Sequence, residues 1–170
     1  GWDFLNTLAD AAMSLTATAQ PQITPNWFYT GRAIALNLAP YEAGYLVASR
    51  EDFAGETYWR LWVKCKQQDG SCGKPLTLPV WDFNSRFTGE IAAYENGGKN
   101  TAAPDGFWVD FTDLASRFGW ERLPALHQWR TYFPAAQFNT LVYRQGLAWR
   151  EALLEIYSIE AVSLLVEKYQ

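Results

Sequence analysis

Apolar and polar residues alternate most clearly over residues 57–65, which we interpret as a strand. Trp59, Leu61 and Val63 fall on one face of this strand, because successive side chains point to opposite sides. The opposite face mixes rings with bases, and its members are Tyr58, Arg60, Trp62 and Lys64. Basic side chains keep their charged ends in water. We therefore expect the second face to be only partly buried.

Three other short runs also predict strands, at residues 32–38, 45–49 and 75–80. The first run alternates and ends before a proline. The last run contains two prolines, which favours an edge position because proline donates no hydrogen bond to a ladder. Together with residues 57–65, these runs predict a small antiparallel meander.

Helical spacing of apolar residues marks both ends of the chain. Residues 3–18 predict an N-terminal helix that Asp3 caps. Residues 147–157 predict a C-terminal helix, and residues 158–169 either extend it or form another. The fold class that follows is α+β, with a small antiparallel sheet packed against N-terminal and C-terminal helices.

Two features of the middle of the chain complete this outline. Residues 84–106 are rich in Gly, Asn and Pro and form the longest candidate loop. A short helix follows, with Thr112 as its cap and Gly119 just past its end, although Asp110 or Asp113 could cap it instead.

Length and composition set the broad class. A chain of 170 residues fits one domain, so we expect a single domain over residues 1–170. Aromatic residues make up 16% of the chain, which excludes disorder. The chain begins with Gly rather than Met, so we expect it to be a fragment cut from a longer protein or a mature product.

Charge, apolar run length and histidine content argue against several kinds of partner and site. The net charge is −4 and lysines are few, which disfavours nucleic-acid binding. No run of about 18 apolar residues occurs, so we expect no membrane span. His127 is the only histidine, which disfavours multi-histidine metal sites and histidine-based triads. We expect neither a metal nor another cofactor.

The two cysteines, Cys65 and Cys72, enclose an Asp-Gly turn signal. A four-residue hairpin loop would place them opposite each other and within disulfide reach, whereas a two-residue turn would strain the bridge. A metal site lacks further ligands at usable spacing. We predict a disulfide worth on the order of 2–3 kcal/mol, and with it an oxidising compartment.

A pair of carboxylates is the one catalytic arrangement that the sequence leaves open. Glycosidases use two acids that flank the scissile bond. Asp110 lies inside an apolar run, where burial would raise its pKa, but no pair stands out by spacing. The candidate acids are Glu51, Asp52, Glu56, Asp82, Asp110 and Glu121.

The excess of aromatic residues suggests a binding surface. Trp and Tyr offer flat faces on which sugar rings stack. Most of the rings should fill the core, but two groups that mix rings with polar residues are surface candidates. The candidate ligand-binding residues are Trp81, Asp82, Arg86, Trp129 and Arg130.

Six strings along the chain resemble an uncharacterised domain associated with TolB-type β-propeller proteins of bacterial envelopes. They are GRAIA at 31–35, TYWR at 57–60, WDFN at 81–84, FGWERLP at 118–124, GLAW at 146–149 and LEIY at 154–157. The resemblance implies an extracytoplasmic accessory domain of bacteria. It supplies neither catalytic residues nor a ligand.

Three functional hypotheses follow. The first is a non-enzymatic extracytoplasmic module that binds a polysaccharide, peptidoglycan or an envelope protein. The second is a glycosidase-like hydrolase with a carboxylate pair. The third is a structural domain that docks on a neighbouring β-propeller. A cleft with two acids about 5–10 Å apart would favour the enzyme, exposed rings would favour sugar binding, and a broad apolar patch would favour docking.

Overall fold

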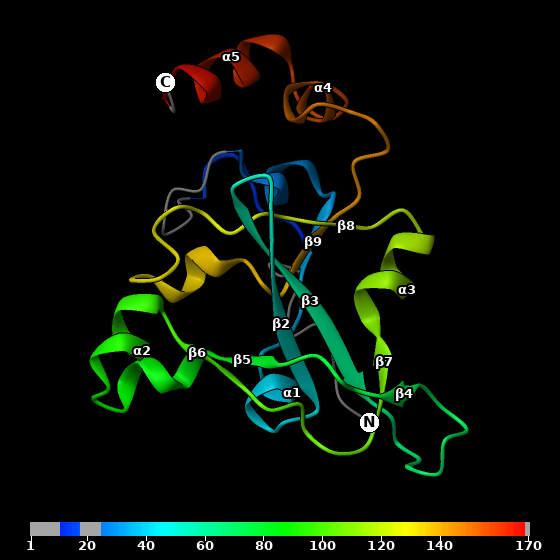
Figure 1. Cartoon of the computed structure of the whole chain (residues 1–170). Coiled ribbons are helices and arrows are strands. Elements are labelled where there is room, and N and C mark those ends of the chain that lie inside the picture. The colour runs from blue at the N-terminus through cyan, green and yellow to red at the C-terminus, as the bar shows by residue number, and fades with distance from the viewer. Residues whose placement is uncertain (1–10, 18–24, 169–170) are drawn as a thin grey trace.

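The computed structural model of the chain describes residues 11–17 and 25–168. The α+β fold class is confirmed: three small antiparallel sheets are flanked by short helices. The β2–β3 hairpin runs through the middle of the molecule, with α2 on one side, α3 on the other, and the C-terminal helices above its turn (Figure 1).

The central sheet contains the longest strands. Its strand order is β2–β3–β7–β4, and its strands are β2 (Leu46–Phe53), β3 (Glu56–Lys64), β7 (Phe107–Asp110) and β4 (Lys74–Pro75). Ala54 and Gly55 form the hairpin turn, and both have positive φ, as a type I′ turn requires. The register pairs Glu51 with Tyr58.

The other two sheets are smaller. One has the order β1–β9–β8, with β1 (Ala33–Ala35), β9 (Thr140–Val142) and β8 (Glu121–Arg122). The other pairs β5 (Val80–Asp82) with β6 (Lys99–Thr101).

Helical segments fill the spaces between the sheets. The α-helices are α1 (Ala39–Glu42), α2 (Ile91–Asn96), α3 (Phe111–Arg117), α4 (Trp149–Leu154) and α5 (Ile159–Lys168). The 3₁₀ segments are η2 (Trp27–Thr30), η3 (Phe83–Phe87) and η4 (Phe133–Ala136).

An aromatic cluster forms the main core under one face of the central sheet. Trp59 lies at its centre and contacts the rings of Trp81, Phe83 and Trp129 at centroid distances of 4.6–5.9 Å. Its indole Nε1 donates to the carbonyl of Ala136 at 2.8 Å. The prediction for residues 57–65 is confirmed, since Trp59 and Leu61 are buried whereas Tyr58 and Arg60 are only partly buried.

The strands do not form one meander, which corrects part of the sequence-based expectation. The run at 32–38 contributes only β1, which pairs with β9 from far along the chain. The run at 75–80 divides between β4 and β5, which belong to different sheets. Pro79 stands between them, and proline donates no ladder hydrogen bond.

The predicted helices have mixed outcomes. Most of residues 3–18 lie outside the described residues, and residues 11–17 form turns in which the Met13 amide donates to the Phe28 carbonyl. Residues 84–106, predicted as a loop, contain α2 and β6. The cap of α3 is Asp110 rather than Thr112, since the Asp110 carboxylate accepts from the Asp113 amide at 2.9 Å.

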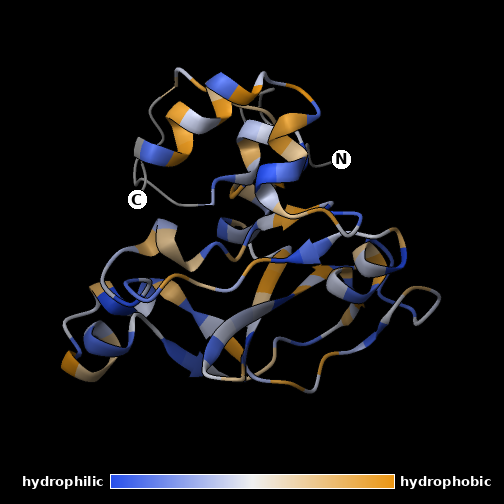
Figure 2. Ribbon diagram, turned by 90° about the horizontal axis from the view of Figure 1, so that it is seen from above, coloured by the Kyte–Doolittle hydropathy of each residue, from blue (hydrophilic) through white to orange (hydrophobic). Residues whose placement is uncertain are grey.

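The C-terminal segment forms two helices, α4 and α5. Hydrophobic and hydrophilic residues interchange along both, as expected for helices with one buried face (Figure 2). Leu153, Val162 and Leu165 are buried together with Tyr29 of η2. Trp149 adds a hydrogen bond from its indole Nε1 to the Asn26 carbonyl at 2.9 Å.

The predicted disulfide between Cys65 and Cys72 is present, with a Cα–Cα distance of 5.9 Å. It arises differently from the hairpin that the spacing suggested, because β3 and β4 are not neighbours. Both pair with β7, and Lys64 and Lys74 lie on opposite sides of Trp108. The cystine therefore closes a loop that carries the chain across the end of β7.

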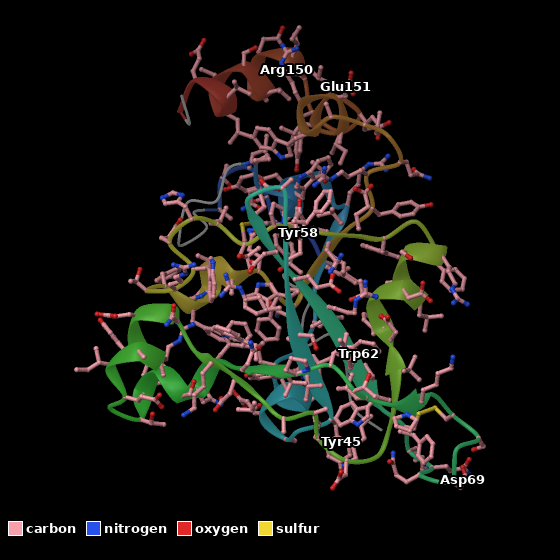
Figure 3. The ribbon with its side chains drawn as sticks, in the orientation of Figure 1. Tyr45, Tyr58, Trp62, Asp69, Arg150 and Glu151 are labelled. Atoms are coloured by element: carbon pink, nitrogen blue, oxygen red, sulfur yellow. A yellow bond between two sulfur atoms is a disulfide. The ribbon has the colours of Figure 1, made fainter. Side chains whose placement is uncertain are left out.

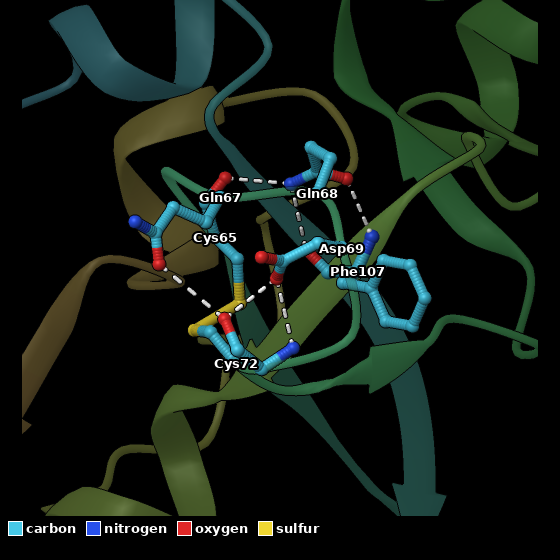
Figure 4. Close-up of a disulfide and its surroundings, with 7 residues drawn as sticks. Cys65, Gln67, Gln68, Asp69, Cys72 and Phe107 are labelled. Carbon is cyan, nitrogen blue, oxygen red and sulfur yellow. Dashed lines mark hydrogen bonds between the residues drawn. A yellow bond between two sulfur atoms is a disulfide. The ribbon is translucent and has the colours of Figure 1, made fainter.

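The side-chain amide of Gln68 holds this loop to the sheet, because it bonds to backbone groups as a neighbouring strand would. Its side-chain Oε1 accepts from the Phe107 amide at 2.7 Å, and its Nε2 donates to the Cys65 carbonyl at 2.6 Å (Figure 4). Asp69 orders the loop tip by accepting from the backbone amide and the hydroxyl of Ser71.

Candidate functional site

The two tryptophans expected on the surface belong to the core. Trp81 is 6% exposed and Trp129 is 4% exposed, and their rings contact each other at 5.8 Å. The expectation that their rings are exposed is therefore wrong. The Arg50 guanidinium lies 5.2 Å from both ring centroids and covers the cluster, so neither ring offers a free face for stacking.

The polar members of the predicted site serve local structure, and several of them lie around the backbone of Gly97 and Gly98. Asp82 caps η3 by accepting from the Asn84 amide at 2.9 Å. Arg86 is buried and donates to the carbonyls of Phe83 and Gly97. Arg130 is exposed beside Trp129.

An open groove of about 480 Å³ lies elsewhere, on the polar face of the central sheet. Its volume falls within the usual range for ligand sites, about 300–1,000 Å³. Its floor and walls come from β2, β3, α3, β8 and the residues after β9, which meet beside the hairpin (Figure 1). The two strands of the hairpin contribute Glu51, Phe53, Tyr58 and Arg60.

A network of ion pairs forms the floor of the groove. The Arg60 guanidinium donates to Glu51 at 2.5 Å and to Asp110 at 2.6 Å. The other oxygen of Glu51 accepts from Arg122 at 2.6 Å. Because Asp110 also caps α3, the network fixes the helix against the hairpin.

Aromatic side chains form the walls. Phe53 extends from the hairpin and is largely exposed. Tyr58 also lines the groove and lies nearer the hairpin turn than Trp62, which is on the same face toward the other end of β3 (Figure 3). Trp120, after α3, is half-buried and packs on Tyr143 at 5.5 Å.

The electrostatics of Glu51 follow from its two arginines. Burial alone would raise its pKa, but hydrogen bonds from Arg60 and Arg122 overcome that effect and lower the pKa below the ordinary value of 4.5. Glu51 is therefore a carboxylate at neutral pH. Its role here is to hold two guanidinium groups in fixed orientations.

Arg144 closes one end of the groove. Its Nε lies 3.6 Å from the Glu121 carboxylate, and that buried nitrogen has no hydrogen-bond partner among residues 11–17 and 25–168. Its guanidinium lies 5.2 Å from the Trp27 ring. A smaller pocket of about 120 Å³ begins on its other side and shares Arg144 and Pro124 with the groove.

Other kinds of site have less support. Within residues 11–17 and 25–168, no three His, Cys, Asp or Glu side chains gather closely enough to hold a metal ion. His127 is an exposed loop residue. None of the helices in the described part of the chain has the length and apolar character of a membrane span.

The sequence identified some groove residues only as candidate catalytic acids, and it did not identify several others as site residues. Glu51 and Glu121, two of the candidate acids, line the groove, whereas Asp110 is not part of its lining and meets Glu51 through Arg60. Trp120, Arg122 and Arg144 were missed. The mixed face of residues 57–65 was the available signal, but the strand register was needed to place Glu51 opposite Tyr58.

Comparison with known proteins finds no matching family, no matching curated protein and no matching solved structure.

Proposed function

We propose that this chain is a non-enzymatic, extracytoplasmic module that binds a polysaccharide in the groove beside the β2–β3 hairpin. The observation that carries the proposal is the lining of the groove, where Tyr58 and Trp120 stand beside oriented arginines. Sugar rings present apolar faces that stack on aromatic rings, and hydroxyl groups that bond to charged planar side chains.

The partners of the acids at the groove favour binding over hydrolysis: Asp113 pairs with Arg117, and Glu121 lies 3.6 Å from Arg144. A glycosidase needs one protonated carboxylic acid, whose pKa is raised. The pKa of Glu51 is instead lowered by Arg60 and Arg122. Asp110 accepts from Arg60 and from the α3 backbone, so its oxygens are engaged.

The disulfide supports an extracytoplasmic location, because structural disulfides persist mainly in oxidising compartments. The resemblance to the domain associated with TolB-type propellers supports the bacterial envelope as that compartment. One of the resembling strings, at 118–124, contains Trp120 and Arg122 of the groove.

An envelope protein, such as a neighbouring β-propeller, is the second candidate ligand. It is favoured by a separate surface on η3 and α2, where Phe87, Ile91 and Tyr94 are exposed. Exposed apolar residues that lie together are typical of protein interfaces.

Calorimetric titration with a panel of polysaccharides and peptidoglycan fragments tests the glycan proposal. We expect saturable binding to at least one member, and Trp120→Ala should weaken it up to about tenfold, since an aromatic contact contributes about 0.5–1.5 kcal/mol. Tyr94→Ala, which removes an exposed ring outside the groove, is the matched control. Trp129→Phe should also leave the affinity unchanged, because its ring is buried.

Two results would contradict the proposal. A flat response across the whole panel would remove the glycan and direct attention to protein partners. Binding that Trp120→Ala leaves unchanged would place the ligand outside the groove.

A further inference from the structure

We infer that the ligand of the groove is an acidic polysaccharide, and that Arg144 and Arg122 bind the carboxylates of its uronate units. The inference rests on the proposed glycan site and adds the chemical class of the sugar. Its starting point is that the three arginines that line the groove differ in how many of their N–H donors are bonded to carboxylates of the protein.

Arg60 has the least capacity left for a ligand. Its Nε donates to Glu51 and its Nη1 to Asp110, so two carboxylates already balance one guanidinium. Adding a third carboxylate would bring like charges together. Arg60 therefore orients the floor of the groove.

Arg122 keeps most of its donors. A guanidinium has five N–H groups in a planar fork, and one of them, on Nη1, donates to Glu51 at 2.6 Å. The group lies 5.5 Å from the centroid of the Tyr58 ring. A sugar carboxylate that accepts from Arg122 would therefore lie near an aromatic wall of the groove.

Arg144 has the largest unmet requirement. Its Nε is buried without a hydrogen-bond partner in the part of the chain that the structure describes, which is costly for a charged donor. Its contact with Glu121 is 3.6 Å, beyond hydrogen-bond length, and the Glu121 side chain is half-exposed. The enclosed Nε is out of reach of a ligand, but the Arg144 side chain is 34% exposed, so a ligand carboxylate would pair with the rest of the guanidinium where it lines the groove.

The position of Arg144 between two cavities is compatible with a ligand longer than one sugar. The groove and the smaller pocket both include Arg144 and Pro124, so they adjoin at this side chain. The smaller pocket is mostly apolar, with Trp27 and Leu126 among its walls. A ligand that extended from the groove into the smaller pocket would contact Arg144.

The negative net charge of the chain means that an acidic polymer must be bound through contacts within the groove. The net charge is −4, so long-range electrostatics do not attract an acidic polymer. The attraction must come from close contacts in the groove. Such contacts depend on the spacing of carboxylates along the polymer. They are also weakened by salt.

The decisive experiment compares two ligands that differ only in charge. Short oligogalacturonates and their methyl-esterified forms have the same sugar backbone, and only the free acid carries carboxylates. We expect the full chain to bind the free acid about tenfold or more tightly, since hydrogen bonds to charged groups contribute about 1.5–3 kcal/mol. Added salt should weaken binding of the acid and leave the ester unchanged.

Variants then locate the effect. Arg144→Gln and Arg122→Gln should each remove about tenfold of the affinity for the acid, with little change for the ester. Arg150→Gln on α4, outside the groove lining, is the matched control (Figure 3). The comparison of acid with ester uses the unmodified chain, so it holds even if a variant fails to fold.

The other outcomes separate the two proposals. Equal affinity for acid and ester would overturn the inference and leave the glycan site standing. Binding of neither ligand, while another glycan of the panel binds, would also overturn the inference alone. Binding of poly-glutamate as tight as that of the oligogalacturonate would overturn both, because charge without sugar would then suffice.

Discussion

Glu51 fixes the orientation of the two arginines on the floor of the groove. It is half-buried and shared by Arg60 and Arg122, which approach from β3 and β8. A carboxylate between two guanidinium groups gains two charge-assisted hydrogen bonds, which outweigh the cost of its partial burial. The residue therefore joins two sheets and orients the donors of the groove.

Glu51→Gln should destabilise the protein by about 1–3 kcal/mol at neutral pH, because the amide keeps the shape but loses both charged bonds. The folded-state pKa of Glu51 is lowered, so its contribution is complete above the ordinary value of 4.5 and is lost as the pH falls through the lower folded-state pKa. Urea unfolding at a series of pH values measures this difference.

The matched control for this prediction is Glu95→Gln, which changes an exposed glutamate on α2. It should have little effect at any pH. A cost of Glu51→Gln that stays constant from neutral pH into the acid range would show that shape, rather than charge, makes the residue important.

At the scale of elements, the connection between β3 and β4 depends on a single glycine. Gly73 has φ +64°, and a Cβ atom there would lie 2.2 Å from the Trp108 carbonyl oxygen and 2.9 Å from Cys65 Sγ. The chain crosses the end of β7 at this point, inside the disulfide loop. No flexible side chain could move to make room, because the obstacle is the backbone of the neighbouring strand.

Gly73→Ala should therefore cost about 3 kcal/mol or more, from backbone strain and overlap together. Gly70→Ala is the matched control, since Gly70 lies in the same loop with φ +85° and its Cβ would meet only the Phe107 ring at 3.4 Å. That change should cost about 1 kcal/mol. Equal losses in urea unfolding would show that the close approach to Trp108 does not limit the loop.

The same connection explains what sequence reasoning could and could not predict. The disulfide was predicted correctly from the short cysteine spacing, but the hairpin used to argue for it is absent, because β3 and β4 both pair with β7. The partner of β4 is β7, some thirty positions away along the sequence, and no local pattern specifies it. Asp110 likewise caps α3, as one alternative had it, but its bond to Arg60 depends on the register of β3 with β7.

Exposure of the tryptophans was unpredictable for a related reason. Trp81 and Trp120 both stand among polar neighbours in the sequence, yet the first is core and the second lines the groove. The difference lies in what covers each ring. Trp81 is covered by Trp59 and Arg50, which reach it from the hairpin.

At the scale of the molecule, the C-terminal helices complete a core that begins at the other end of the described chain. Leu153 of α4 and Val162 of α5 are buried against Tyr29, and Trp149 bonds to the Asn26 carbonyl. These contacts join segments separated by more than a hundred positions. The helices are thus part of the fold rather than an appendage to it.

Two adjacent leucines of α4 test this role. Leu153 is fully buried whereas Leu154 is 37% exposed, so one helix supplies both the probe and its control. Leu153→Ala should cost about 2–5 kcal/mol through lost burial and a residual cavity. Leu154→Ala should cost less than about 1 kcal/mol, because its surface is already partly hydrated.

Urea unfolding followed by two probes shows whether the helices unfold with the sheets. If they do, Leu153→Ala lowers the midpoint seen by circular dichroism and that seen by tryptophan fluorescence by the same amount. Separate transitions, with fluorescence from the aromatic cluster around Trp59 unchanged, would instead mean that α4 and α5 form an independent unit. In that case the groove, which depends on the hairpin and α3, would keep its ligand affinity when the helices unfold.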